Sequence, residues 1–271
     1  MIPVNLSFCL SLISLRLSNN QLHGRIPVEL GNMLTSLQRL SLKNNSLTGA
    51  IPVSLSNLSS LYQLDLAKNH LAGPIPSGFG NFQGLKFLDL YENNLSGVLP
   101  HSIYNLSLLK DFQVEVNMLF GTIPADIGST FPSIEIPSFS DNRFSGAIPY
   151  LLSNLSALVK LGFAGNRFSG YVPPIFASLQ GLTDLYLNAN QLDADYMEGW
   201  EFITSLTNCS QLQRMVLGNN SSSGQVTTSI TNLSTSLQNL YLGDNIIYGA
   251  IPFNIVNLVG LNILKMRILP Y

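Results

Sequence analysis

The chain has 271 residues, 10% of them charged, and a formal net charge of −2 at pH 7. A balance this close to neutral provides neither the basic stripe that nucleic-acid binding needs nor the polybasic segment that holds a protein on an anionic membrane. No run of about 20 apolar residues is present, so direct insertion into a membrane is not expected.

One leucine-based phrase recurs along the whole chain every 24 or 25 residues, with a single longer interval. Each copy approximates L-x-x-L-x-L-x-x-N-x-L-x-G-x-I-P-x-x-L-x-x-L. A period in this range predicts a solenoid, in which each repeat buries its apolar face against its neighbours. The copies open at Leu12, Leu37, Leu61, Leu85, Leu109, Ile134, Leu158, Leu182, Leu212, Leu237 and Leu261.

The first element of each repeat is predicted to be a short, half-buried strand. In the clearest copy, Leu64 and Leu66 alternate with Gln63, Asp65 and Ala67. This alternation places the leucines in the core and the other three side chains on the open face. Stacking of the repeats therefore predicts one parallel sheet along the concave side of the solenoid.

The rest of the same copy predicts a turn, a tight bend and a short convex segment. Asn69 follows the strand, where its amide can bond turn groups that a parallel stack leaves unpaired. Gly73 permits a tight backbone path, Ile75-Pro76 forms a rigid corner, and Phe79 and Phe82 return to the core. The asparagine recurs as a predicted ladder at Asn20, Asn45, Asn69, Asn93, Asn117, Asn142, Asn166, Asn190, Asn220 and Asn245.

One repeat is expected to interrupt the strand pairing. Pro137 occupies the inward position three residues after Ile134, where the other ten repeats carry Leu, Phe or Met. Because proline has no N–H, one hydrogen bond to a neighbouring repeat should be missing there.

The phrase L-x-G-x-I-P, well shown by residues 47–52, resembles the plant-specific leucine-rich repeat. The expected fold is an α/β leucine-rich-repeat solenoid, a right-handed curved superhelix with a parallel concave β-sheet and a convex side of short 3-10 helices and loops. We expect a single domain over 1–271, with about ten full repeats and partial repeats at both ends. The chain starts and stops in mid-repeat without a polar cap, which suggests a piece of a longer protein.

The longest repeat contains an insertion, predicted at 193–205, whose segment DADYMEGWE holds four acids and two aromatic residues. The simpler interpretation is a loop or short helix that accommodates the extra length. A lid or a contact for a co-receptor is the alternative.

Residues 190–212 around this insertion, with Trp200-Glu201-Phe202 and the phrase Leu206 to Ser210, resemble an interruption found in the ectodomains of plant receptor-like Ser/Thr kinases of subfamily XII. That group includes the rice bacterial-blight resistance receptor. The resemblance implies a ligand-sensing region on the extracellular face of the plasma membrane or in the apoplast. It also implies a membrane helix and a kinase domain, both of which this sequence lacks, as it lacks a signal peptide.

The two cysteines, Cys9 and Cys209, both precede a repeat opening by three residues, which predicts an inward core position for each. They lie eight repeats apart, too far to form a disulfide. Asn-X-Ser/Thr sequences are more informative about the compartment, because they favour a glycosylated extracellular protein. A simpler interpretation is that Asn and Ser are common in such turns. The glycosylation candidates are Asn5, Asn57, Asn94, Asn105, Asn154, Asn208 and Asn232, whereas the ladder residue Asn220 is expected to be inaccessible.

Outward side chains two, four and six residues after each opening residue form columns on the concave face, and two patches stand out. The acidic–aromatic patch suits a basic peptide or loop, because aromatic anchors and charge complementarity are typical of interfaces. Its members are Asp65, Phe87, Asp89, Tyr91, Asp111, Gln113 and Glu115. The tyrosine–arginine patch comprises Tyr186, Arg214 and Tyr241, with Asp184 beside them.

These observations predict a non-enzymatic module that recognises a peptide or protein ligand, with a co-receptor ectodomain as the candidate second partner. No cofactor or metal is expected, because the three histidines are scattered and no ligand cluster or phosphate loop is found. A secreted inhibitor of microbial polygalacturonase is the alternative, since that family has a similar repeat. A glycoside-cleaving pair at Asp65 and Asp89 is disfavoured, because the open face would not exclude water.

Overall fold

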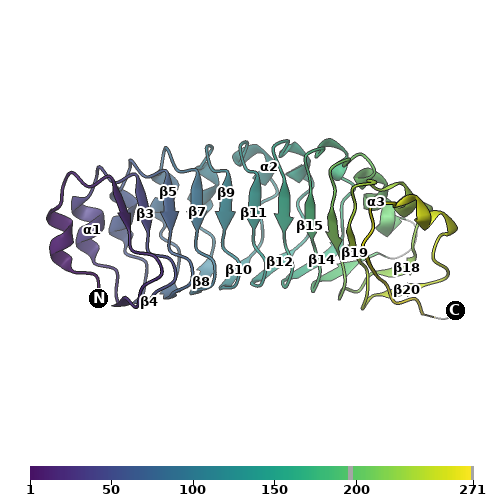
Figure 1. Cartoon of the computed structure of the whole chain (residues 1–271), viewed down its shortest axis with the longest axis horizontal. Helices are drawn as coiled ribbons and strands as arrows, with labels where there is room; N and C mark the ends of the chain where they lie inside the picture. Colours follow the sequence, from purple (N-terminus) through teal and green to yellow (C-terminus); the bar gives the residue numbers. More distant parts are fainter. Residues whose placement is uncertain (195–197, 270–271) are drawn as a thin grey trace. The chain divides into compact units, whose positions relative to one another are not determined.

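The computed structural model describes residues 1–194 and 198–269. It divides into two compact units, Met1–Gly121 and Thr122–Tyr271, and each is described by itself. In both units a repeat passes from a first strand through a turn to a second strand and then to a short helical segment (Figure 1). This is the order of elements that the repeat phrase predicts. In the repeat that opens at Leu261, the described residues contain the first strand alone.

The first strands of each unit form a parallel sheet in chain order, as expected. In the first unit they are β1 (Ser14–Arg16), β3 (Arg39–Ser41), β5 (Gln63–Asp65), β7 (Phe87–Asp89) and β9 (Asp111–Gln113). In the second unit they are β11 (Ile136–Ser138), β13 (Lys160–Gly162), β15 (Asp184–Tyr186), β17 (Arg214–Val216), β19 (Asn239–Tyr241) and β21 (Ile263–Lys265).

The second strands are also parallel, and they form a separate sheet. The first unit contains β2 (His23–Gly24), β4 (Ser46–Gly49), β6 (His70–Gly73), β8 (Asn94–Val98) and β10 (Met118–Gly121). The second unit contains β12 (Arg143–Gly146), β14 (Arg167–Tyr171) and β16 (Gln191–Asp193), and separately the pair β18 (Ser223–Gln225) and β20 (Ile246–Tyr248).

The helical segments are short, because each repeat leaves only a few residues between its corner and the next opening leucine. The first unit has η1 (Val4–Phe8), α1 (Val28–Met33), η2 (Val53–Asn57), η3 (Ser77–Asn81) and η4 (His101–Asn105), where η denotes a 3-10 helix. The second unit has α2 (Ile127–Thr130), η5 (Tyr150–Asn154), η6 (Phe176–Ser178), η7 (Glu198–Trp200), α3 (Glu201–Leu206), η8 (Thr228–Asn232) and η9 (Phe253–Asn257).

The register of the first strands follows the hydrophobic pattern. Leu64 pairs with Leu88, and both side chains are buried, with 0% and 1% exposure. Asp65 pairs with Asp89 on the opposite face of the same strands. A slip of one residue would expose the leucines and bury the carboxylates, so the alternation specifies the register.

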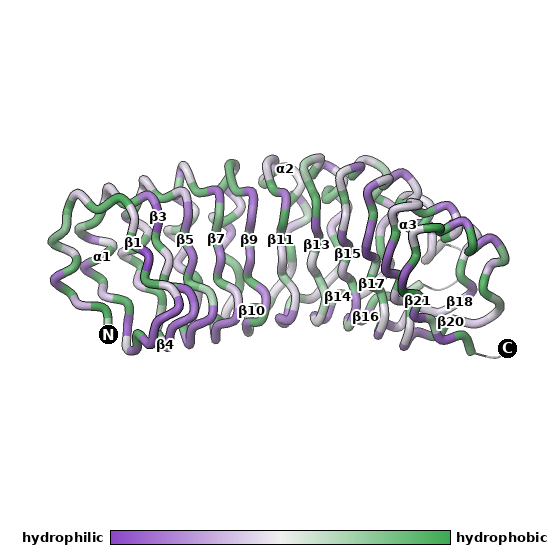
Figure 2. The backbone as a smooth tube through the Cα atoms, in the orientation of Figure 1, coloured by the Kyte–Doolittle hydropathy of each residue, from purple (hydrophilic) through white to green (hydrophobic). Residues whose placement is uncertain are grey.

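The asparagine ladder is confirmed, and it ties each repeat to the one before it. Asn69 Nδ2 donates to the carbonyl of Leu66 in its own repeat and to that of Leu42 in the preceding repeat, both at 3.1 Å. Its Oδ1 accepts the N–H of Leu47 at 3.0 Å. In the repeats that contain β1, β3, β5 and β7, the turn that carries the ladder asparagine is hydrophilic (Figure 2). One amide therefore satisfies three backbone groups that would otherwise be buried without partners.

The residue before each ladder asparagine adopts a left-handed conformation, which no sequence pattern indicated. In the first unit φ at this position is between 53° and 58°, and the residues are Asn19, Asn44, Lys68, Glu92 and Val116. Asparagine tolerates this region, whereas a β-branched side chain does not. Val116, with a φ of 55°, is therefore a strained residue.

Repeat nine departs from the phrase, with Val226-Thr227 where Ile-Pro is expected, and still forms the same corner. Thr227 has a φ of −65° before η8, close to the −67° to −56° of the prolines that precede η1 and η9. Its ladder is less complete, because the Oδ1 of Asn245, which lies in the next repeat, has no hydrogen-bond partner within the described chain. The corner thus depends on backbone path more than on the proline itself.

The predicted interruption at Pro137 is confirmed on the side of the next repeat. Strands β11 and β13 are paired only at Ser138 with Gly162, whereas β13 and β15 are paired over three residues. The proline ring leaves β11 without the N–H that the equivalent residues donate to the following strand.

The prediction that both cysteines occupy core positions is wrong for Cys9. Cys209 is buried, and its Sγ donates to the carbonyl of Phe176 at 3.2 Å, while Cys9 is exposed. Both cysteines have the same repeat position, but Cys9 lies in the outermost repeat of the first unit, where the described residues cover it on one side only. Burial raises the pKa of the Cys209 thiol to about 11.

The insertion of repeat eight is anchored by one aromatic side chain. Residues 195–197 of the predicted 193–205 segment lie outside the described residues. Asp193 ends β16, and residues 198–205 lie in η7 and α3. Trp200 is fully buried, stacks on Phe202 at 6.2 Å between ring centroids, and donates its Nε1–H to the carbonyl of Ser223 at 2.8 Å. Since β16 and β18 are not paired as strands, Trp200 joins the insertion to the start of β18.

No helix in the described part of the chain is both long and apolar enough to cross a membrane.

Candidate ligand-binding face

The side chains that could meet a partner stand on the open face of the first-strand sheet. On β5, Leu64 is buried while Gln63 and Asp65 are half-buried, and β9 follows the same pattern. Parallel pairing at one register stacks equal positions of successive repeats into columns, as the sequence predicts. Each unit therefore presents a grid of side chains on a rigid support.

The acidic–aromatic patch is brought together within the first unit. Pairing of β5, β7 and β9 aligns Asp65 with Asp89 and Gln113, and places Phe87 beside Asp111. Phe87 is 39% exposed, so an apolar ring stands among carboxylates on this face. Aromatic rings with partial exposure and few rotatable bonds are typical anchors of protein interfaces.

The carboxylates of this patch are already organised around one lysine. Lys43 Nζ lies 3.1 Å from Asp89 Oδ2, and Ser41 Oγ donates to Asp65 Oδ2 at 2.8 Å. Partial burial tends to lower the pKa of Lys43, but its hydrogen bond to Asp89 and the charges of Asp89, Asp65 and Asp111 outweigh this and raise it. Burial raises the pKa of Asp65 against the hydrogen bond from Ser41.

Aspartates on the first strands also bond the backbone. Asp65 Oδ1 accepts the N–H of Ala67 at 3.3 Å, and Asp89 Oδ1 accepts the N–H of Tyr91 at 3.1 Å. In both repeats the acceptor comes four residues after the opening leucine and the donor six residues after it. These two aspartates therefore have a structural role, which disfavours a glycoside-cleaving pair at Asp65 and Asp89.

The remaining aromatic residue of the patch, Tyr91, makes a cation–π contact with Lys68. Lys68 Nζ lies 5.6 Å from the centre of its ring and 3.7 Å from Glu92 Oε2. Cation–π contacts at exposed sites stabilise by about 0.5–1 kcal/mol. Tyr91 is thus held in place, while its half-buried ring still reaches the open face.

The tyrosine–arginine patch has a different construction from the expected one, because Asp184 is its buried centre. The Asp184 side chain is 3% exposed, and it accepts from Arg214 at 2.8 Å, from Thr183 Oγ1 at 2.6 Å and from Tyr186 Oη at 3.1 Å. Lys160 Nζ lies 4.0 Å from its other oxygen. Burial tends to raise the pKa of Asp184, but these hydrogen bonds outweigh it and lower that pKa.

Asp184 is therefore not available to a ligand, although its position in the strand had suggested an outward side chain. Two cations share this one carboxylate, so the open face of the second unit has an excess of positive charge around Lys160 and Arg214. The side chains of both are more than 40% exposed. Tyr241, the third member of the patch, is not part of this network.

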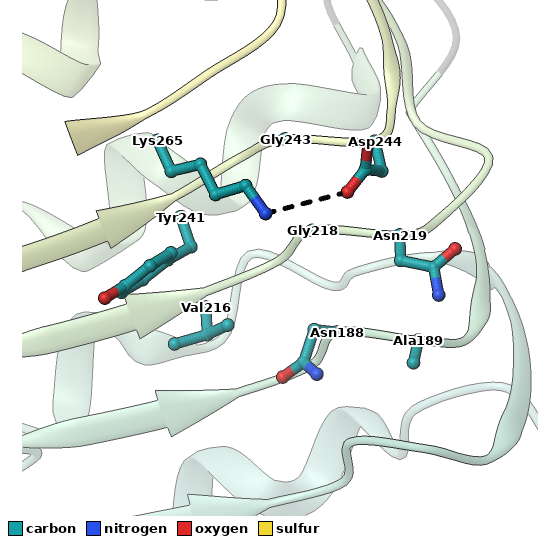
Figure 3. A pocket seen from close by; sticks show the side chains of 9 residues that line it. All are labelled: Asn188, Ala189, Val216, Gly218, Asn219, Tyr241, Gly243, Asp244 and Lys265. Carbon is teal, nitrogen blue, oxygen red and sulfur yellow. Dashed lines mark ion pairs between the residues drawn. The ribbon is translucent and has the colours of Figure 1, made fainter.

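Tyr241 instead lines a hollow of about 180 Å³ on the second unit. Gly218 and Gly243 form part of its wall, and the side chain of Lys265 passes over Gly243 towards Asp244 (Figure 3). The hollow is lined by Asn188, Ala189, Val216, Gly218, Asn219, Tyr241, Gly243, Asp244 and Lys265. Two successive glycines six residues after Leu212 and Leu237 were the only sequence signal for it.

The described residues contain no group of three or more His, Cys, Asp or Glu side chains that could hold a metal ion. The seven glycosylation candidates are all exposed, and six of them lie on or beside the helical segments. The ladder residue Asn220 is different, because its Nδ2 donates to three carbonyls, including those of Leu217 and Leu187.

The repeat geometry and the family comparison define the same class of protein. The model of the family described as "Leucine rich repeat" matches residues 10–71, and a second leucine-rich-repeat model matches residues 84–106. Each of the two units therefore has the leucine-rich-repeat fold.

Among individual proteins it resembles plant receptor kinases. It is 49% identical over 77 residues to the receptor kinase-like protein Xa21 of Oryza sativa subsp. japonica, a match that covers 28% of this chain and 7% of Xa21. It is 42% identical over 83 residues to the LRR receptor-like serine/threonine-protein kinase EFR of Arabidopsis thaliana, covering 31% of this chain and 8% of EFR. The matched segments thus span less than a tenth of these relatives.

Solved ectodomains have the same fold along nearly the whole chain. The plant peptide hormone receptor RGFR1, in complex with RGF2, superposes with a TM-score of 0.89 at 30% identity, covering 98% of this chain and 42% of that one. The ectodomain of the Arabidopsis receptor kinase HAESA, with an extended IDA peptide hormone, gives a TM-score of 0.88 at 32% identity, covering 98% and 43%. HAESA with IDA and the co-receptor SERK1 gives 0.61 at 26% identity, covering 98% and 55%.

Proposed function

We propose that the chain is a non-enzymatic recognition module that binds a peptide or protein segment on the open face of its first-strand sheet. It would serve as part of the extracellular ligand-sensing region of a plant receptor-like kinase, in defence or developmental signalling. A co-receptor ectodomain would be a second partner.

The observation that supports this most is the open face itself. Nearly every residue of the repeat phrase is committed to the core, the ladder or a corner, whereas the outward strand positions vary from repeat to repeat. In the first unit they bring Phe87 together with Asp65, Asp89 and Asp111 around Lys43. The likeness to known ectodomains supports a peptide ligand, since RGFR1 is a peptide hormone receptor and HAESA was solved with a peptide hormone bound.

The acidic–aromatic patch is the proposed centre of binding. Its excess of carboxylates favours a basic segment, and charges on an open face influence association rate more than affinity. Phe87 and Tyr91 would provide most of the affinity, because exposed ion pairs contribute only about 0–1 kcal/mol each.

Random 12-residue peptides displayed on phage provide the test. Peptides selected on the intact chain should be rich in Lys and Arg. They should lose at least about tenfold in affinity for the Phe87→Ala, Tyr91→Ala double variant, since loss of a hot-spot residue costs about 1.4 kcal/mol or more. The Asp89→Asn, Glu115→Gln variant should instead reduce the association rate and its salt dependence.

The matched control is the Tyr186→Ala, Tyr241→Ala variant, which removes two tyrosines from the second unit. The proposed centre is wrong if the selected peptides bind the Phe87→Ala, Tyr91→Ala variant like the wild type but lose affinity for the Tyr186→Ala, Tyr241→Ala variant. If repeated selection enriches no peptide, peptide recognition by this chain is rejected.

A further inference from the structure

The hollow at Tyr241 exposes backbone donors of a kind that repeats three and four cover with a carboxylate. In repeats three and four, the N–H six residues after the opening leucine donates to an aspartate four residues after it, at Ala67 and Tyr91. The equivalent donors in repeats nine and ten are the N–H groups of Gly218 and Gly243. Their strands carry Val216 and Tyr241 at the aspartate position, and neither side chain can take that acceptor role.

Neither glycine N–H has a hydrogen-bond acceptor within the described residues. The two aspartates of the first unit stand on the open face of the sheet, so the donors they cap face the same side. By repeat equivalence, the N–H groups of Gly218 and Gly243 also face the open side, where both residues line the hollow. A glycine has no side chain that could cover its own N–H.

The positive charge around the hollow favours an anionic hydrogen-bond acceptor. Lys265 crosses Gly243 with its aliphatic stem, whose Cε would lie 3.4 Å from a Cβ at that position. Its Nζ is 3.9 Å from Asp244 Oδ2, and both side chains are more than 60% exposed. An exposed pair of this kind is weak and open to competition from another carboxylate. Arg214 and Lys160 add positive charge on the same face, because they share the single carboxylate of Asp184.

The side chains of Asn188 and Asn219, which also line the hollow, add amide donors. Neither has a hydrogen-bond partner within the described part of the chain. Successive backbone N–H groups beside a cation form concave sites for anionic oxygens. The two glycines, the two amides and Lys265 together present donors, and Asp244 at the rim is the only carboxylate of the lining.

We propose that this hollow is a subsite for a carboxylate of the bound peptide. This carboxylate accepts from the N–H groups of Gly218 and Gly243, as the Asp65 and Asp89 carboxylates accept from the equivalent N–H groups in repeats three and four. The inference rests on the proposed function, because it presumes a ligand on the open face. It goes beyond that proposal, because it assigns an acidic group of the ligand to the second unit.

The test uses the intact chain and two small probes, the blocked tripeptides acetyl-Gly-Glu-Gly-amide and acetyl-Gly-Gln-Gly-amide. Amide proton shifts of Gly218 and Gly243 are followed by NMR in deuterated protein. We expect downfield shifts of both on addition of the glutamate probe, and no comparable shift with the glutamine probe. Before any probe is added, both amides should exchange with solvent faster than those of Ala67 and Tyr91.

Variants separate geometry from charge. Tyr241→Asp recreates the arrangement of Asp65 and Ala67, so it should shift the Gly243 resonance without a probe and weaken binding of the glutamate probe at least about tenfold. Asn239→Asp adds the same charge two residues earlier on the strand, roughly 13 Å from the Gly243 N–H, and should keep most of the binding.

The inference is overturned if neither glycine responds, if both probes shift them equally, or if Asn239→Asp weakens binding as much as Tyr241→Asp. A response confined to residues near Arg214 and Lys160 also overturns it, while leaving the open face as a ligand site. Selected peptides that bind the Phe87→Ala, Tyr91→Ala variant like the wild type, with the glycine response intact, would reject the proposed centre of binding and retain this subsite.

Discussion

At the scale of single residues, the repeat imposes one backbone conformation on side chains of very different tolerance. The position before each ladder asparagine is left-handed, and in the first unit Asn19 and Asn44 accept it while Val116 does not do so easily. A β-branched residue there costs of order 1–2 kcal/mol relative to one that tolerates the region. The fold therefore contains a local strain at Val116, whose side chain is 38% exposed.

Replacing Val116 by Asn should raise the free energy of unfolding by about 1 kcal/mol, because it relieves this strain. Urea denaturation followed by circular dichroism measures the change. Val98→Asn is the control, since Val98 is an exposed valine on β8 of the same unit with ordinary strand backbone. A Val116→Asn variant no more stable than the control variant would show that the left-handed turn stores no strain.

The ionisation of Asp184 makes the free energy of unfolding depend on pH in the acid range. Its pKa is lowered in the folded protein by the hydrogen bonds of Thr183, Arg214 and Tyr186, which outweigh burial. A group with a lowered pKa stabilises the fold above its ordinary pKa of 3.8, and this contribution is lost as the pH falls through the folded value. The loss therefore occurs below pH 3.8 and leaves neutral pH unaffected.

Asp184→Asn should lower the free energy of unfolding by about 1–3 kcal/mol at pH 7, the range for a lost charged hydrogen bond. It should also flatten the decline of stability on acidification below pH 3.8. Urea unfolding at a series of pH values tests this. Asp244→Asn, which breaks the exposed pair with Lys265, should leave the decline unchanged. Equal acid sensitivity in Asp184→Asn and the wild type would contradict the assignment.

At the scale of elements, each repeat is too small to be stable alone, and its strands, ladder and short helical segment are completed by the next repeat. The insertion of repeat eight shows how an irregular element is accommodated. It ends the regular pairing of second strands between β16 and β18, and Trp200 bonds the start of β18 instead. This supports the simpler interpretation of the insertion, an accommodation of extra length, for the part that the structure describes.

Trp200→Phe should reduce the free energy of unfolding by about 1–3 kcal/mol, since it keeps a buried ring but removes the donor to Ser223. Trp200→Ala should cost about 3–5 kcal/mol through loss of a fully buried side chain. Denaturant unfolding provides both values. Tyr171→Phe, at a half-exposed tyrosine of β14, is the control and should change little. Wild-type stability in Trp200→Phe would mean that the bond to Ser223 contributes nothing.

At the scale of the whole molecule, the two units differ in the charge of their open faces. The first has an excess of carboxylates around Lys43, and the second an excess of cations around Asp184. The exposed glycosylation candidates lie on the helical segments or on β8, away from these faces.

Expression through a secretory pathway should attach glycans at the exposed candidates and spare Asn220, whose amide is engaged in the ladder. Enzymatic deglycosylation in heavy-oxygen water followed by tandem mass spectrometry identifies the modified residues. Asn208 is an informative comparison, because it is an exposed sequon that shortly precedes Asn220 in the sequence. A glycan at Asn220, or none at the seven candidates of a secreted chain, would contradict the assignment.

The repeat phrase alone was sufficient to predict the parallel strands, their register, the ladder and the flaw at Pro137. Those features depend on residue type at a fixed phase, and every repeat restates them. The candidate site was predicted only as columns of outward residues. Which of those side chains are free, and which are paired, depends on neighbours in adjacent repeats, such as Arg214 for Asp184.

By itself, therefore, the sequence determined the repeat, its hydrophobic alternation and the polar groups that close each turn, because these are local and periodic. Only the tertiary structure decided that Asp184 is buried between two cations, that Cys9 is exposed, that Val116 is strained and that Gly218 and Gly243 leave two donors uncovered. Each of these depends on the backbone path of the turn or on what the adjacent repeat places against a residue. The repeat pattern predicts only the positions that all repeats share. It does not predict contacts between the variable residues of successive repeats, because those residues differ from one repeat to the next.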